Sequence, residues 1–184
     1  SKNWQVTCSY AEDGKHKEVM VYADGTTRAR QTATWSSTLQ LPIIKEDFYD
    51  AVGRTAVEVM PVPMIFNICD ELSDGSNWAP IDYYQEFNEA YDNNQGRHIF
   101  TYEDLEPDGP DCALQVTKLD PNTGAEYYYN PLSVGNSSNA IEQSKFIPRA
   151  DGHPYVQTEY MPDQTGRVKR KGGVGEDHQL NGHA

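Results

Sequence analysis

The sequence predicts a mostly β protein, in which antiparallel β-hairpin repeats form part of a curved sheet with long acidic loops and at most one or two short helices. Three observations predict this class. A short pattern, an aromatic residue followed by Asp, Gly and Arg, recurs along the chain. The segments beside it alternate in polarity, as strands with two unlike faces do. The 12 Tyr and 3 Trp residues favour an ordered chain, because aromatic side chains bury large areas and are scarce in disordered sequences.

Four copies of the pattern can be aligned, and each is expected to be the turn of a hairpin. Asp and Gly tolerate the positive φ angles that tight hairpin turns require, so one strand should end and another begin at each copy. Partial copies occur at residues 120–124 and 150–155. The turn residues of the four copies are Tyr22, Asp24, Gly25 and Arg28; Tyr49, Asp50, Gly53 and Arg54; Tyr91, Asp92, Gly96 and Arg97; and Tyr160, Asp163, Gly166 and Arg167.

The strands around the first copy show the alternation most clearly. Before the turn, Val19 and Val21 are expected on the face opposite to Met20 and Tyr22. After the turn, one face should contain Arg28, Arg30, Thr32 and Thr34, and the other Ala29, Gln31, Ala33 and Trp35. The period is two rather than 3.6, as in a strand.

Helix is expected to be scarce, and four regions follow one another along the chain. Residues 82–90 are the main helix candidate, with Asp82 as the cap, and residues 140–145 are a candidate for one turn. Prolines interrupt residues 61–82 and the acidic stretch 103–111, which we expect to be loops outside the sheet. The four regions are hairpin repeats at 1–64, an irregular insertion with a short helix at 65–111, hairpin repeats at 112–171 and a Gly-rich connector at 172–184.

The composition limits the core and the partners. Leu, Ile, Val and Phe are few and the net charge is −13, so the core is expected to be shallow or shared. Nucleic acid is not expected as a partner, because a phosphate backbone is met by clustered Lys and Arg. The one basic run, residues 167–171, alternates with Val168 and suits a strand with a charged face.

Neither the ends nor the cysteines identify a compartment. There is no signal peptide and no apolar run of transmembrane length, so membrane insertion is not expected. The chain opens at Ser1 and stops inside a Gly/His-rich stretch, so both ends are interpreted as cuts, and the missing signal peptide says nothing about the parent protein. Cys8, Cys69 and Cys112 fit no metal-binding spacing, and both a Cys69–Cys112 disulfide and ordinary buried thiols remain open.

No catalytic, cofactor-binding or metal-ligating residue is predicted. Acidic pairs in the loops are interpreted as solvated charges, and residues 70–77 lack an EF-hand pattern because the twelfth position is Ile81 rather than Glu. The histidines are scattered, and no nucleophile elbow or phosphate-binding loop occurs. The acidic pairs are Glu71 with Asp74, Asp104 with Glu106, and Asp108 with Asp111, and the histidines are His16, His98, His153, His178 and His183.

The tyrosine run at residues 127–129 leaves two interpretations open. On a strand, Tyr127 and Tyr129 would lie on one face and Tyr128 on the other, and the rings would pack across hairpins. Alternatively, these rings would stack against sugars together with Tyr83, Tyr84 and Trp78, in a carbohydrate-binding or adhesive module.

The second copy of the pattern, Tyr49-Asp50-Ala51-Val52-Gly53-Arg54, resembles the YD repeat of RHS proteins. The resemblance extends to residues 22–35, where an Asp-Gly turn precedes a long strand. It also extends to residues 146–175, where Gln-Thr-Glu-Tyr is followed by Gly-Arg and a Gly-rich segment, as in very large secreted bacterial RHS proteins. Residues 65–111 show no pattern of the family.

The resemblance implies a hollow shell of hairpin repeats, which in toxin-bearing members encloses an effector, and an extracellular or cell-surface location. Some members have a self-cleaving aspartate site, in which Asp-Pro-x-Gly is followed shortly by a Gly pair. Residues 120–124 are followed by Ala-Glu-Tyr instead, so no catalytic residue is transferred. The chain is therefore expected to be a non-catalytic structural segment without a cofactor, whose partners are neighbouring repeats of the same parent chain and a glycan or other cell-surface ligand.

Overall fold

The computed structural model describes residues 3–12, 16–36, 41–63, 85–92, 96–99, 118–130, 147–163 and 165–180. It confirms the mostly β class, since antiparallel strands dominate these residues. The helical elements among them are α1 (Gly124–Tyr129) and the 3-10 turns η1 (Gln85–Asn88) and η4 (Glu176–His178). The strands are β1 (Asn3–Tyr10), β2 (His16–Ala23), β3 (Ala29–Ser36), β4 (Leu41–Tyr49), β5 (Thr55–Pro63), β6 (Glu89–Asp92), β7 (Gly96–Ile99), β8 (Tyr155–Tyr160) and β9 (Val168–Lys171).

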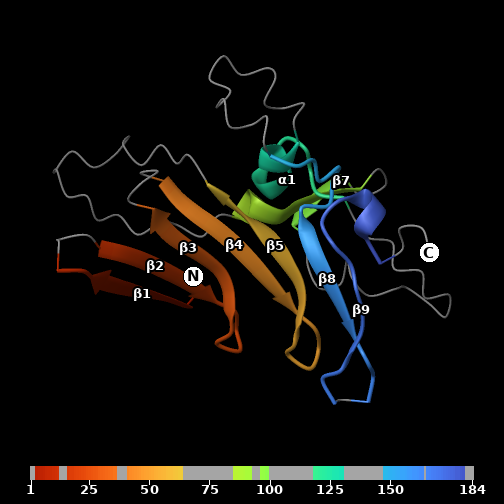
Figure 1. The fold of residues 1–184 in the computed structure, drawn as a ribbon, viewed down its shortest axis with the longest axis horizontal. Helices are drawn as coiled ribbons and strands as arrows, with labels where there is room; N and C mark the ends of the chain where they lie inside the picture. The colour runs from red at the N-terminus through yellow and green to blue at the C-terminus, as the bar shows by residue number, and fades with distance from the viewer. Residues whose placement is uncertain are drawn as a thin grey trace. The chain divides into compact units, whose positions relative to one another are not determined.

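The strands form a seven-stranded sheet, in the order β1-β2-β3-β4-β5-β8-β9, and a separate ladder of β6 and β7 (Figure 1). The chain divides into two compact units, residues 1–46 with 61–84 and residues 47–60 with 85–184. Strands β4 and β5 contribute residues to both units, and each unit is described by itself.

The first unit is a meander in which each strand pairs with the next one along the chain. Antiparallel ladders set Val6 of β1 opposite Met20 of β2, Met20 opposite Ala33 of β3, and Ala33 opposite Ile44 of β4. Residues that are opposite one another in an antiparallel pair share a face. These four residues therefore form one apolar row, which is buried at Met20, Ala33 and Ile44 and exposed at Val6.

The alternation predicted around the first turn is confirmed on its buried face. Met20 and Tyr22 are buried on β2, while Val19 and Val21 are half-buried. On β3 the buried residues of the predicted face are Gln31 and Ala33, whose neighbours in sequence are half-buried.

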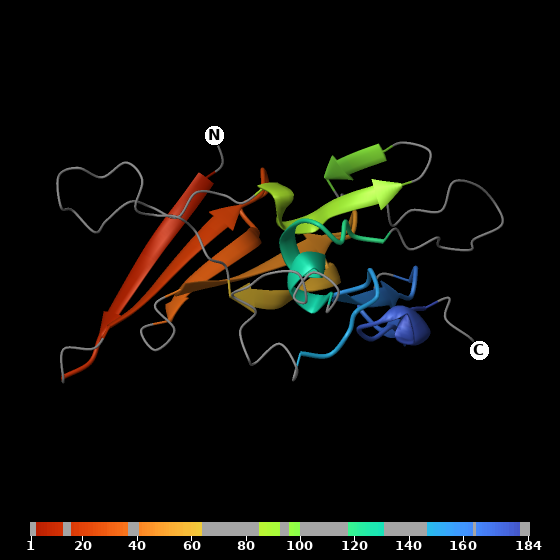
Figure 2. The ribbon, with the colours of Figure 1, turned by 90° about the horizontal axis from the view of Figure 1, so that it is seen from above.

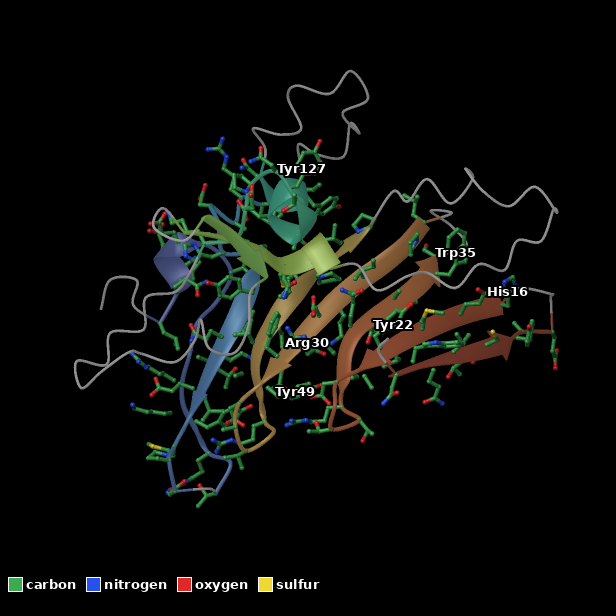
Figure 3. All side chains as sticks on the ribbon, turned by 180° about the vertical axis from the view of Figure 1, so that it is seen from behind. His16, Tyr22, Arg30, Trp35, Tyr49 and Tyr127 are labelled. Carbon is green, nitrogen blue, oxygen red and sulfur yellow. The ribbon has the colours of Figure 1, made fainter. Side chains whose placement is uncertain are left out.

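Arg30 departs from the alternation because it lies in a β-bulge. Tyr22 pairs with Gln31 and Ala23 with Ala29, so Arg30 is the extra residue of β3. A bulge re-aims the side chain at its site. Arg30 Nε donates a hydrogen bond of 2.8 Å to Oε1 of Glu46, a carboxylate that is fully buried on β4. Figure 3 shows Tyr22 and Arg30 on the neighbouring strands β2 and β3.

The second unit pairs β5 with β8 and β8 with β9, and it contains the β6–β7 ladder and α1 (Figure 2). In β5 the buried Val57 and Val59 flank the exposed Glu58, the pattern of a half-buried strand. Helix α1 contacts η1. The core residues of this unit include Phe48, Val57, Val59, Phe87, Leu119, Ala125, Ala150 and Tyr155.

The helix predicted over residues 82–90 is wrong in extent. The described part contains the single 3-10 turn η1, and strand β6 begins at Glu89 and pairs with β7 as far as Asp92. A helix this short is marginal in water, whereas the ladder with β7 supplies hydrogen bonds from a second segment. The turn predicted over residues 140–145 lies outside the described residues.

The tyrosine run is helical, so its prediction as a strand is wrong. The partial copy at residues 120–124 begins as a turn, but the chain then enters α1 after Thr123, the N-cap. Ala125 and Tyr129 are buried four residues apart, on one side of the helix, while Tyr127 is 44% exposed and projects from α1 (Figure 3). The buried residues are thus spaced as on one side of a helix, and they do not alternate as the side chains of a strand do.

Residues 172–180, at the start of the predicted Gly-rich connector, pack closely. The backbone N–H of Gly172 donates to Gln157 O at 2.8 Å and that of Gly173 donates to His178 O at 2.7 Å. A Cβ atom on Gly172 would lie 3.1 Å from the backbone N of Leu180, a close approach that favours glycine. Among the described helices, none is long and apolar enough to cross a membrane.

Candidate functional site

The first copy of the pattern is the turn between β2 and β3, and the Asp24 side chain organises it. Oδ1 of Asp24 accepts hydrogen bonds from the backbone N–H groups of Thr26 (2.8 Å) and Arg28 (3.0 Å) and from the Thr26 hydroxyl (2.6 Å). Arg28 Nε lies 3.3 Å from Oδ2 of the same carboxylate. The backbone N–H of Asp24 donates to Arg28 O at 2.9 Å and closes the hairpin.

The second copy repeats this arrangement between β4 and β5. Oδ1 of Asp50 accepts from the backbone N–H groups of Val52 (3.0 Å) and Arg54 (2.8 Å), and Arg54 Nε donates to Oδ2 at 2.7 Å. The backbone N–H of Asp50 donates to Arg54 O at 2.8 Å. The side chain of Asp50 is 13% exposed, against 26% for Asp24, so this is the more deeply buried of the two ion pairs.

The fourth copy joins β8 to β9 with the same residue types at the same spacing. Oδ1 of Asp163 accepts from the Thr165 backbone N–H (3.1 Å) and hydroxyl (2.7 Å), and the Arg167 guanidinium donates to Oδ2. The closing hydrogen bond comes from two positions earlier, since the backbone N–H of Met161, and not that of Asp163, donates to Arg167 O at 2.8 Å.

The third copy also separates two paired strands, as predicted. Tyr91 of β6 is opposite Arg97 of β7, and Asp92 is opposite Gly96. Residues 93–95 and the side chains of this hairpin lie outside the described part of the structure.

The left-handed residue of these turns is the third one after the aspartate. It is Thr27 (φ 66°) in the first copy, Gly53 (φ 94°) in the second and Gly166 (φ 76°) in the fourth. In the first turn Thr27, and not Gly25, adopts the positive φ angle. A β-branched residue in this region is strained. The common motif is Asp, two variable residues, a left-handed residue and Arg.

Hydrogen bonds control the pKa values of these aspartates. Burial by itself raises the pKa of Asp24 and Asp50, but the N–H donors of the turn and the arginine charge outweigh it, so both pKa values end below the ordinary 3.8. In the exposed fourth turn, the Arg167 hydrogen bond is the main cause of the lowered pKa of Asp163. All three turns therefore favour the ionised carboxylate.

Two copies contact each other through Arg54 and Tyr160. The Arg54 guanidinium carbon lies 4.4 Å from the centre of the Tyr160 ring, within the range of a cation–π interaction. The Tyr160 hydroxyl donates to Thr55 O at 3.0 Å. The arginine of one turn thus packs on the aromatic residue of another, which links the β4–β5 hairpin to the β8–β9 hairpin.

The sequence analysis missed a second polar cluster, in which α1 binds the turn before β8. Glu126 on α1 is 2% exposed, and its Oε1 accepts a 2.8 Å hydrogen bond from the Gly152 backbone N–H. No described residue donates a hydrogen bond to Oε2. Gly152 has φ 92°, and a Cβ there would lie 3.0 Å from the Lys118 side chain, so any other residue would be strained at this position. The one signal in the sequence was Asp151-Gly152, which was recognised as a partial copy.

Desolvation dominates the electrostatics of this cluster. It raises the pKa of Glu126 from 4.5 to about 7, helped by the Asp151 charge and opposed by the Gly152 N–H and the Lys118 charge. Burial, and next the Glu126 charge, raise the pKa of the neighbouring Tyr155. A buried carboxyl with a pKa near neutrality is a common feature of acid–base sites. In the described structure, the hydrogen-bond partner of Glu126 is a backbone N–H of the same unit.

The other candidates from the sequence contribute no site to the described residues. The acidic pairs at residues 71–111, the stretch 70–77, Cys69, Cys112, His183, Trp78, Tyr83 and Tyr84 lie outside them. Cys8 is a free, half-buried thiol on β1. Within the described ranges, no three His, Cys, Asp or Glu residues are grouped so that they could hold a metal ion.

No protein-family model, no curated protein and no solved structure matches this chain.

Proposed function

We propose that the chain is a non-catalytic structural segment of a bacterial RHS/YD-repeat shell or surface protein, which encapsulates or presents an effector encoded elsewhere in the parent. The observation that supports this most is the recurrence of one turn chemistry. In three hairpins an aspartate accepts turn hydrogen bonds through one oxygen and binds the arginine four residues later through the other.

This turn chemistry suits a repeat that must stop and reverse a strand many times. A side-chain oxygen that replaces the missing backbone partners favours a reversal over continued extension. The contact between Arg54 and Tyr160 then connects one hairpin to another. Both features stabilise hairpins in series, which is what a shell wall requires.

The proposed partners are neighbouring repeats of the parent chain, in an extracellular or cell-surface location. Nucleic acid is disfavoured by the ion pairs of the basic run. Lys169 Nζ lies 2.7 Å from Glu159 Oε1, Arg170 contacts the other oxygen of Glu159, and Arg167 is bound to Asp163. These cations are already paired within the chain, and the net charge is −13.

The first test is a thermal melt by far-UV circular dichroism of this chain and of a longer one with its natural flanks. A structural segment should melt broadly or aggregate by itself and melt sharply when flanked, because its core is shared with its neighbours. A sharp cooperative melt of the 184-residue chain alone would contradict the proposal and favour a self-contained binding module.

The alternative is a carbohydrate-binding or adhesive module, and exposed aromatic rings are the observation in its favour. Trp4 is 58% exposed, Tyr10 71% and Tyr127 44%. Within the tyrosine run Tyr129 is buried in α1, and Tyr83, Tyr84 and Trp78 lie outside the described residues. Binding on a glycan array that is lost in Trp4→Ala or Tyr127→Ala would support this alternative.

A further inference from the structure

Strand β1 is an end strand of the sheet whose sequence suits pairing with another strand. It pairs with β2 alone among the described strands. The far edge of such a strand presents backbone N–H and C=O groups that can template a further strand. Native proteins protect edges with charged side chains. At the other end of the strand order, β9 has this protection in its sequence Val-Lys-Arg-Lys, whereas residues 3–11 contain no charged residue.

One face of β1 is apolar and uncovered. Trp4, Val6 and Tyr10 are 58%, 40% and 71% exposed. The register sets Trp4 and Val6 opposite Tyr22 and Met20, which are both 6% exposed. The buried face of β2 therefore continues onto β1, where it meets solvent. Exposed apolar side chains of this kind mark a surface that binds another protein segment, whereas charged or polar side chains at this edge would be stable in water.

We propose that the edge of β1 pairs antiparallel with β1 of a second copy of this chain. A two-fold axis perpendicular to the sheet keeps the apolar faces of both copies on the same side of the sheet. This is possible only when even-numbered residues pair with even-numbered ones and odd-numbered residues with odd-numbered ones. With Thr7 on the axis, Trp4 faces Tyr10 of the other copy and Val6 faces Cys8. Trp4, Val6, Cys8 and Tyr10, which lie on the same face of β1, then each have a partner on the other copy.

Other registers lose these contacts. With Val6 on the axis, Tyr10 has no partner within β1, and with Cys8 on the axis, Trp4 faces the exposed acid Glu12. The register centred on Thr7 combines two aromatic pairs with a Thr–Thr pair, which are favourable cross-strand combinations.

Charge explains why this strand is the point of contact. Each copy has a net charge of −13, so two copies repel each other over most approaches. The uncharged strand lets them meet without placing like charges in contact. A single pair of edge strands buries an area at the low end of specific interfaces, so the dimer is expected to exchange with monomer and to strengthen as salt screens the repulsion. This inference does not rest on the proposed function.

Sedimentation velocity of the full chain, from low micromolar concentration to about 200 μM, tests the association. We expect a concentration-dependent shift from monomer to dimer that increases with salt. Val6→Lys should raise the dissociation constant at least about tenfold, because it puts a charge into each half of the apolar face. Val52→Lys is the matched control, since Val52 is 63% exposed in the β4–β5 turn and should leave the dimer unchanged.

Disulfide trapping tests the register. In a cysteine-free background (C8S, C69S, C112S), Thr7→Cys should give a disulfide-linked dimer on mild oxidation, because the two thiols face each other at the axis. Gln5→Cys should not, because Gln5 faces Ser9 in this register. A chain that stays monomeric throughout would overturn the proposal and leave the edge for a strand of another protein segment. Equal trapping of T7C and Q5C, or growth beyond dimer, would overturn it as well.

Discussion

Replacing Glu126 by Gln should stabilise the protein at alkaline pH but not at acid pH. The wild-type carboxyl has a pKa of about 7 in the folded state and an ordinary pKa of 4.5 when the chain is unfolded and the group is in water. The folded protein thus holds a proton that the unfolded chain releases between these values. The contribution of Glu126 to stability must fall as the pH rises from 4.5 to about 7 and must then level off.

The size of the effect follows from the same shift. A difference between 4.5 and about 7 corresponds to about 3 kcal/mol of unfolding free energy. Gln cannot ionise, and its amide oxygen can still accept the hydrogen bond that Gly152 N–H donates at 2.8 Å. The amide NH2 then occupies the place of Oε2, which no described residue donates to, so part of the gain is offset by an unsatisfied donor at about 1 kcal/mol. A net stabilisation of about 2 kcal/mol is expected at pH 8.

Urea denaturation of the wild-type and Glu126→Gln proteins, each in the longer chain with its natural flanks, followed by circular dichroism at several pH values between 4 and 9, measures this directly. The difference between the two chains isolates Glu126, because all other titrating groups are shared. Glu46→Gln is the matched control: Glu46 is equally buried, but it accepts from Arg30 Nε at 2.8 Å. Breaking that ion pair should destabilise the protein by about 2 kcal/mol. A Glu126→Gln chain that is less stable than wild type at pH 8, or a difference that does not change with pH, would refute the reasoning.

Three further predictions concern the turns, and urea midpoints measure each of them. Asp50→Asn should lower stability by about 1 to 2 kcal/mol at pH 7. Because the pKa of Asp50 in the folded protein lies below 3.8, the difference in stability should disappear as the pH falls through this lowered pKa. A difference that stays constant with pH would contradict the assigned role. Thr27→Gly should stabilise the protein by about 1 kcal/mol, because glycine relieves the left-handed strain at φ 66°, and a loss of stability would show that the strain is absent. Gly25 and Gly166 both have open space for a Cβ, but of these two only Gly166 has a positive φ. Gly166→Ala should therefore lower stability by about 1 to 2 kcal/mol, while Gly25→Ala should be neutral or stabilising. Equal effects of the two substitutions on stability would be inconsistent with this assignment.

The hairpins were predictable because their information is local. The alternation of Met20 and Tyr22 with Val19 and Val21, and the Asp and Arg residues of each turn, lie within a few positions of one another. Side-chain-to-backbone hydrogen bonds of an aspartate reach two to four residues along the chain, so sequence alone shows where they can form. Strand β9 in the basic run is a second example of this kind.

Tertiary structure decided the features that depend on distant segments. The tyrosine run became helix α1 because Ala125 and Tyr129 bury one side of it in the core of its unit, and alternation within three residues contains no information about that core. The bulge at Arg30 depends on how β3 pairs with β2, and its ion pair joins it to Glu46, which is sixteen residues away in the sequence. The burial that raises the pKa of Glu126, and the hydrogen bond that Glu126 accepts from Gly152, exist only when the second unit has folded. Local chemistry therefore specified where the chain turns, whereas burial and long-range contacts determined what lies between the turns.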